Sequence, residues 1–212
     1  MKRLAIISIV MCLFIAGCDQ KPEAPFGFKW GQSISEVEKL GLSKFKVDGE
    51  PTYLQIASVD SAPQEVYDAK WFILSFMPDS GLMGITMYSK GVDENSYYFN
   101  TGRALYNKLS LMLEDKYGKP ISVNEKVDKD GDDFYLCLQD KSCGSWLREY
   151  SKDGVKVTLS VSPHPGQLLA SQPKASIQVS YEYYTDDMKR KDEKFYHSLE
   201  NKEKEASVKN NY

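Results

Sequence analysis

The sequence predicts an α+β protein in which helices cover one face of an antiparallel sheet. Residues that favour strands are frequent, among them 14 tyrosines in 212 residues. Short apolar runs alternate with turn residues, and two longer segments instead carry apolar residues at helical spacing. Each of these two segments precedes a series of strands. We therefore expect two helix-plus-meander units, although the halves share too little residue identity to demonstrate a duplication.

The first unit begins near residue 26. Aromatic residues alternate from Phe26 to Trp30, which predicts a brief strand. Ser33 and Glu36 match a capping box, so a short helix should follow and end at Gly41. Strands are then expected over residues 45–47, 53–59, 70–77 and 82–88, the last two joined by a turn at 78–81.

The second unit begins with the longest predicted helix, residues 95–117. Its apolar stripe consists of Leu105, Leu109, Met112 and Leu113. Further strands are expected over 121–127, 134–138, 146–150, 155–161 and 176–184, with a turn at 128–133 and a loop at 163–173. From residue 186 the chain is densely charged, which predicts a solvated helix that docks weakly and frays after about Glu205.

The N-terminus has the pattern of an export signal. Lys2 and Arg3 precede an apolar run that is shorter than the ~20 residues of a membrane span, so residues 1–17 are predicted to be a signal peptide. The stretch Ile15-Ala16-Gly17-Cys18 resembles the lipobox of bacterial lipoproteins. This resemblance covers about the first 18 residues and implies cleavage before Cys18 and lipidation of its thiol. The alternative is an ordinary cleaved signal peptide with a stray cysteine.

The lipobox resemblance also implies a location. Acyl chains on Cys18 would anchor residues 18–25, a tether with two prolines, to a membrane. Asp19 resembles the signal that retains enterobacterial lipoproteins in the inner membrane, and Gln20 is compatible with it. We therefore expect the periplasmic face of the inner membrane, with the outer membrane as the alternative. Residues 26–185 would form the periplasmic domain and 186–212 a charged helix and tail.

Composition excludes some partners. Without residues 1–17 the chain has 195 residues, with 25 basic against 30 acidic side chains and a formal charge of about −5. No basic block is present, so nucleic acid is not expected as a partner.

Cys137 and Cys143 are predicted to form a disulfide, because an even pair in an oxidising compartment is typically joined. Closing so short a loop should stabilise the fold by about 2 kcal/mol. The alternative is two separate buried thiols.

No catalytic residue, metal ligand set or cofactor site is recognised. His164 and His197 are the only histidines, and no set of three or four soft or imidazole ligands for zinc is visible, so both are interpreted as surface residues. The acidic run from Asp128 to Asp133 lacks the glycine and glutamate positions of a calcium loop, and a hairpin turn explains it better. Paired carboxylates for glycoside hydrolysis remain open.

Two motifs resemble those of small exported lipoproteins of the beta-lactamase-inhibitor-protein type. They are Trp30-Gly31-x-Ser33-x-x-Glu36-Val37 and Leu113-x-x-x-Tyr117-Gly118-x-Pro120. The resemblance spans about two-thirds of the chain and implies helices on one face of an antiparallel sheet.

Aromatic residues supply a candidate recognition surface. Two sets, Tyr97, Tyr98, Phe99 and Tyr181, Tyr183, Tyr184, are expected to divide between core and surface. If the last strand lies at a sheet edge, Tyr184 and Glu182 should face a partner. We therefore expect a non-enzymatic binding, scaffold or inhibitor module for another envelope protein. The alternatives are a hydrolase acting on peptidoglycan or sugar through Asp and Glu residues, and a purely structural envelope protein.

Overall fold

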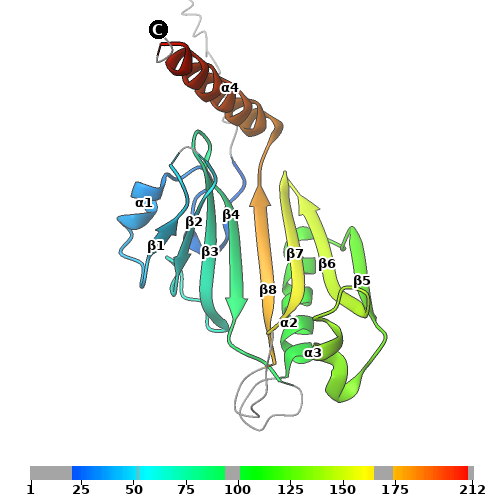
Figure 1. Ribbon diagram of the computed structural model, residues 1–212. Helices are drawn as coiled ribbons and strands as arrows, with labels where there is room; N and C mark the ends of the chain where they lie inside the picture. The colour runs from blue at the N-terminus through cyan, green and yellow to red at the C-terminus, as the bar shows by residue number, and fades with distance from the viewer. Residues whose placement is uncertain (1–20, 52, 94–100, 165–173, 210–212) are drawn as a thin grey trace, which may run out of the picture.

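The computed structural model describes residues 21–51, 53–93, 101–164 and 174–209. These residues form one eight-stranded antiparallel sheet with helices packed against it (Figure 1). The predicted signal peptide, Cys18, Asp19 and Gln20 lie outside the described residues, as do Tyr97 to Phe99 and most of the predicted loop at 163–173.

Two four-stranded meanders meet in the middle of the sheet. The first contains β1 (Lys46–Asp48), β2 (Gln55–Val59), β3 (Ala69–Met77) and β4 (Gly81–Ser89). The second contains β5 (Ser122–Val127), β6 (Gly144–Lys152), β7 (Val155–Pro163) and β8 (Ala175–Tyr183). The strand order is β1-β2-β3-β4-β8-β7-β6-β5, so the last strands of the two meanders pair with each other.

Each meander follows a helix. The helix α1 (Ile34–Glu38) precedes the first meander and α2 (Gly102–Tyr117) precedes the second. The predicted α+β class and the two helix-plus-meander units are therefore confirmed.

The hydrophobic core lies between α2 and one face of the sheet. The helix contacts β6, β7 and β8, whose inward residues include the buried Val157 and Leu159. Leu105 and Leu113 of the predicted α2 stripe are buried, and Leu109 packs against the core. Met112 departs from the prediction, because 59% of its surface is exposed.

The start of α1 follows the predicted capping box. The Ser33 hydroxyl accepts a hydrogen bond from the Glu36 backbone N–H at 3.3 Å, and the Glu36 carboxylate accepts one from the Ser33 N–H at 2.7 Å. These hydrogen bonds from Ser33 favour the ionised carboxylate and lower the pKa of Glu36. Two backbone N–H groups at the start of the helix are thereby satisfied.

The prediction of a strand at 134–138 is wrong. The 3₁₀ turn η2 (Gly131–Asp133) leads directly into the short helix α3 (Phe134–Cys137). Phe134, Tyr135 and Cys137 are all buried. A strand would place the adjacent Phe134 and Tyr135 on opposite faces, whereas a helical turn directs both toward one core. The acidic run at 128–133 therefore does not close a tight hairpin.

The predicted strand at residues 26–30 is also wrong. Pro25–Gly27 forms a 3₁₀ turn, η1, in which Phe26 has a positive φ of 61°. Phe28 and Trp30 are nevertheless buried. The alternation of aromatic residues therefore correctly indicated that Phe28 and Trp30 are buried. These rings are carried by an irregular segment and not by a strand.

The charged helix α4 (Asp186–Lys209) extends beyond the predicted fraying point at Glu205. It projects from the end of the sheet where β8 finishes (Figure 1). Met188 and Asp192 are buried on this helix, and Asp192 Oδ2 accepts hydrogen bonds from Ser80 Oγ at 2.9 Å and from Tyr184 OH at 3.0 Å. Among the described helices, none is long and apolar enough to cross a bilayer.

Candidate binding surface

No described helix packs over the outward face of the central strands. In Figure 1, α2 lies behind β6 to β8, and this face is turned toward the viewer. Side chains alternate along each strand, so every buried residue has outward neighbours. On β4, β7 and β8 these neighbours are mostly half-buried hydroxyl and amide residues: Thr86, Thr158, Ser160, Gln178 and Ser180.

Hydrogen bonds connect these side chains across the join between the meanders. Thr86 Oγ1 and Ser180 Oγ share a hydrogen bond of 3.0 Å, and Gln178 Nε2 donates to Ser180 Oγ at 3.0 Å. Thr86 and Ser180 are also register partners in the β4–β8 pair. We call these five side chains the hydroxyl row. Hydroxyl and amide groups both donate and accept hydrogen bonds, so the hydroxyl row retains hydrogen-bonding capacity toward a partner.

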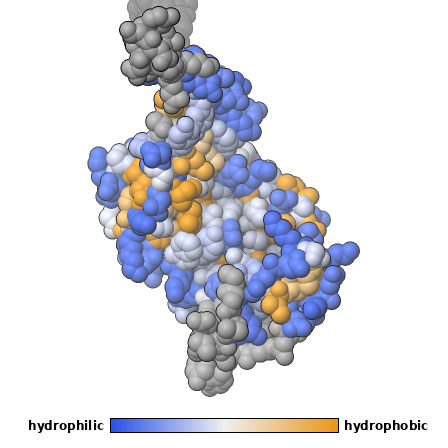
Figure 2. Space-filling model, in the orientation of Figure 1, coloured by the Kyte–Doolittle hydropathy of each residue, from blue (hydrophilic) through white to orange (hydrophobic). Residues whose placement is uncertain are grey.

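An aromatic pair lies beside the hydroxyl row. Trp71 on β3 and Tyr88 on β4 are register partners, and their rings stack with centroids 4.4 Å apart and planes 12° apart. Partial burial raises the pKa of the Tyr88 hydroxyl. Ile73 on β3 and Ile56 on β2 are half-buried on the same face, two register positions apart. Figure 2 shows the result, with hydrophobic surface over β2 and β3 beside a pale, weakly polar area in the middle of the sheet.

We call this set the open sheet surface: Ile56, Trp71, Ile73, Thr86, Tyr88, Thr158, Ser160, Gln178, Ser180 and Glu182. Of these residues, only Glu182 was predicted from the sequence to face a partner. The others occupy the outward positions of alternating strands, and that alternation is their only sequence signal. It does not reveal which strands become neighbours.

The last strand does not lie at a sheet edge. β8 is bordered by β4 and β7. The expectation that Tyr184 and Glu182 together face a partner required β8 to be an edge strand, and it is not one. Glu182 is exposed on the open sheet surface. Tyr184 follows β8 and is held by Asp192 of α4. Tyr181 is buried, and Tyr183 stacks on Trp30 with centroids 5.7 Å apart.

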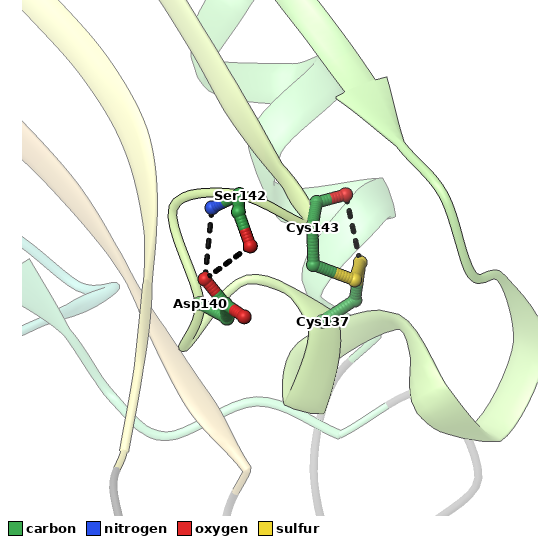
Figure 3. The surroundings of a disulfide bond; sticks show 4 residues. All are labelled: Cys137, Asp140, Ser142 and Cys143. Atoms are coloured by element: carbon green, nitrogen blue, oxygen red, sulfur yellow. Dashed lines mark hydrogen bonds between the residues drawn. A yellow bond between two sulfur atoms is a disulfide. The ribbon is translucent and has the colours of Figure 1, made fainter.

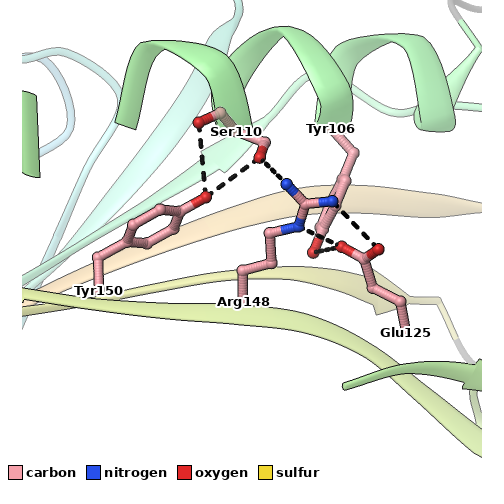
Figure 4. A network of polar contacts seen from close by, with 5 residues as sticks. All are labelled: Tyr106, Ser110, Glu125, Arg148 and Tyr150. Carbon is pink, nitrogen blue, oxygen red and sulfur yellow. Dashed lines mark hydrogen bonds and ion pairs between the residues drawn. The ribbon is translucent and has the colours of Figure 1, made fainter. Parts of the chain in front are cut away.

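A polar network lies on the opposite side of the sheet, beneath α2 (Figure 4). Arg148 Nε donates to Glu125 Oε1 at 2.5 Å, and Arg148 NH1 donates to Ser110 Oγ at 2.6 Å. Tyr106 OH donates to Glu125 at 2.9 Å, and Ser110 Oγ shares a hydrogen bond with Tyr150 OH. The hydrogen bond to the Glu125 carboxylate raises the pKa of Arg148. Burial is the larger cause, and the hydrogen bond to Glu125 the smaller one, of the raised pKa of Tyr106. These mutually satisfied groups fasten α2 to β5 and β6.

The predicted disulfide between Cys137 and Cys143 is present, with Cα atoms 5.2 Å apart. It closes the connection between α3 and β6 (Figure 3). Inside this loop, Asp140 Oδ1 accepts hydrogen bonds from the Ser142 N–H and hydroxyl, each at 2.8 Å. These bonds lower the pKa of Asp140. The pair is therefore a structural crosslink of an ordered turn.

The histidines lie far apart in the fold. His164 Nε2 lies 2.9 Å from Ser176 Oγ, but Ser176 is only 5% exposed, so this hydroxyl is inaccessible as a nucleophile. His197 is exposed on α4, 3.9 Å from Glu200. Within the described ranges, no group of three or more His, Cys, Asp or Glu side chains is placed to hold a metal ion.

Hydrogen bonds lower the pKa of several carboxyl groups. Four described carboxyl groups have a displaced pKa, and in each it is lowered: Glu36, Asp130, Asp140 and Asp187. The largest causes are hydrogen bonds from Ser33, Arg103, Ser142 and Lys191, respectively. A general acid requires the opposite shift, so none of these four suits proton donation to a glycosidic oxygen.

Fold and surface together define an α+β protein in which helices cover one sheet face and no described helix covers the other. The chain matches no known protein family, no curated protein and no solved structure. The resemblance to small exported lipoproteins therefore stays a prediction.

Proposed function

We propose that this protein is a lipid-anchored periplasmic module that binds another envelope protein, without catalysis, through the open sheet surface. The observation that carries the proposal is the stacked Trp71–Tyr88 pair beside the hydroxyl row of Thr86 and Ser180, on a face that no described helix covers.

The chemistry of this surface suits protein recognition. Rigid aromatic rings supply contact area at low entropic cost, and small hydroxyl side chains adapt their hydrogen bonds to the partner. Aromatic residues are also enriched among the residues that dominate binding energy. The strands provide a stable base, because the inward residues beside this surface, including Leu74, Ile85 and Val179, are almost completely buried.

The anchor adds a geometric constraint. Cys18 precedes Lys21, the first described residue, by three positions, and three residues span at most about 11 Å. A lipid on Cys18 would thus hold the domain close to the bilayer and raise its effective concentration toward neighbouring membrane proteins. Asp19 and Gln20 favour the inner membrane, with the outer membrane as the alternative.

The anchor is tested by comparing Cys18→Ser with Cys12→Ser, which removes the other cysteine near the N-terminus. Mass spectrometry of the purified N-terminal peptide should show diacylglycerol on the parent and Cys12→Ser proteins and none on Cys18→Ser. Lipid on all three would contradict the assignment of Cys18. Sorting is tested by density-gradient separation of membranes from cells that make the parent protein or an Asp19→Ser variant. The parent should be found in the inner membrane and the variant in the outer membrane.

The binding role is tested by crosslinking in cells at native abundance, followed by mass spectrometry. One recurrent envelope protein should be captured by the parent protein and lost when Cys18 is replaced by Ser in a soluble secreted form of the protein. Absence of any recurrent protein partner would contradict the proposal.

A further inference from the structure

A groove of about 360 Å³ lies on the helix-covered side of the sheet, opposite the open sheet surface. One wall is α2, which contributes Leu109, Met112 and Leu113, and the floor consists of Met87 on β4 with Val179 and Tyr181 on β8. The other wall is the connection between β2 and β3. We call this hollow the seam groove, because its floor joins the last strands of the two meanders.

The seam groove has the properties of a small-molecule site. Its volume falls within the range of about 300–1,000 Å³ that is typical of ligand pockets, and its lining is mainly apolar. Met112 lines it although 59% of this side chain is exposed. Methionine is flexible and polarisable, so it adapts to an apolar ligand.

Charges at the mouth are asymmetric. Lys108 on α2 forms an ion pair with Asp68 on the opposite wall, Nζ to Oδ2 at 2.8 Å, so these two charges neutralise each other. Lys116, two turns further along α2, also lines the groove. Its Nζ lies 5.6 Å from the centre of the Tyr117 ring, and it makes no ion pair within the described part of the chain. The acidic residue Glu65 lies on the opposite wall. A negative head group would therefore be accommodated at the Lys116 side.

We infer that the seam groove binds a long-chain fatty acid, with the hydrocarbon chain on the floor and the carboxylate toward Lys116. Removing methylene groups from water drives the binding, and the lysine supplies charge complementarity to the head group. The site lies on the opposite side of the sheet from the open sheet surface, so this inference does not depend on the proposed protein partner.

The test uses the full chain carrying Cys18→Ser, which leaves no acyl group on that residue, titrated calorimetrically with palmitic acid. Saturable one-to-one binding is expected. Met112→Glu should weaken it at least tenfold, because a carboxylate would enter the groove. Leu111→Glu is the matched control: Leu111 is 70% exposed on the same helix and does not line the groove, so affinity should stay within twofold.

Head-group recognition is tested with hexadecanol, which has the same chain length and no charge. Palmitic acid should bind more tightly than hexadecanol, and Lys116→Gln should remove that preference. Equal binding of the two ligands by the parent protein, or equal weakening by Met112→Glu and Leu111→Glu, would overturn the inference.

If Met112→Glu fails to fold, photo-crosslinking of the Cys18→Ser chain locates the binding site without that variant. Palmitic acid with a diazirine in its chain should label residues 108–117 or β8 of the Cys18→Ser chain. Labelling confined to other segments would overturn the inference.

Discussion

Trp71 and Tyr88 stack almost parallel across neighbouring strands, with ring centres 4.4 Å apart, on the sheet face that no described helix covers. The pairing fixes both rings before any partner arrives, so little side-chain entropy remains to be lost on binding. In the proposed binding surface, this preorganised pair is the rigid part. The hydroxyl row beside it is the part that adapts its hydrogen bonds to the partner.

Replacing Trp71 with alanine should weaken partner capture at least tenfold, because a central aromatic anchor typically contributes more than about 1.4 kcal/mol. The measurement is a pull-down titration with the captured envelope protein. Tyr67→Ala is the control, since Tyr67 is 80% exposed and lines the seam groove on the other side of the sheet. Equal effects of the two substitutions would contradict a role for the open sheet surface. Thermal unfolding of both variants separates lost binding from lost stability.

Asp192→Ala should release α4 from the domain. Ser80 and Tyr184 both donate to this buried carboxylate, and the substitution leaves both hydroxyls without their acceptor. We expect amide exchange in residues 186–202 to rise at least tenfold while exchange in β7 and β8 stays unchanged. Asp187→Ala is the control, because Asp187 lies on α4 but is 63% exposed. Unchanged exchange in Asp192→Ala would show that other contacts hold the helix.

The docking of α4 should weaken at alkaline pH. Burial and the hydrogen bond to Asp192 raise the pKa of Tyr184 to about 12, above the value of about 10 for an unperturbed tyrosine. The docked state therefore binds this proton more tightly than the released state. Its contribution is fully present below about pH 10 and is lost as the pH rises through about 12.

An ultraviolet difference titration between the parent protein and Tyr184→Phe measures this directly. The one tyrosine that the variant lacks should ionise near pH 12 in the parent protein. Ionisation of that tyrosine near pH 10 would contradict the buried hydrogen bond to Asp192.

Glu125→Ala should destabilise the domain by about 2 kcal/mol, because Arg148 and Tyr106 both lose their acceptor beneath α2. The side chains of Arg148 and Glu125 retain 25% and 19% exposure, so the effect should fall below that of a fully buried pair. The measurement is equilibrium unfolding in urea. Asp60→Ala is the control: its ion pair with Lys44 is exposed, and its loss should cost about 0.5 kcal/mol or less. Indistinguishable values would mean that the network does not fasten the helix.

The elements that could be predicted from the sequence depend on neighbouring residues. Ser33 and Glu36 are three positions apart, and their reciprocal hydrogen bonds were predictable from that spacing. The inward alternation of Val157 and Leu159 was predictable for the same reason. The segment at Phe134 was predicted wrongly because a short apolar run fits a strand and a helical turn equally well.

The binding surface depends on contacts between distant residues. Thr86 and Ser180 are 94 positions apart, and only the β4–β8 pairing brings their hydroxyls together. Trp71 and Tyr88 are closer in sequence, but their alternation alone does not show which sheet face the helices leave uncovered. Strand order and helix placement decide this, and neither follows from local spacing.

The most direct test is site-specific photo-crosslinking in living cells. A photoreactive residue is placed at Thr158 on the open sheet surface or, as a control, at Leu111 on the exposed side of α2. We expect the same envelope protein to be crosslinked repeatedly from Thr158 and not from Leu111. Capture of that protein from Leu111 alone, or of no envelope protein from Thr158, would contradict the open sheet surface as the binding site.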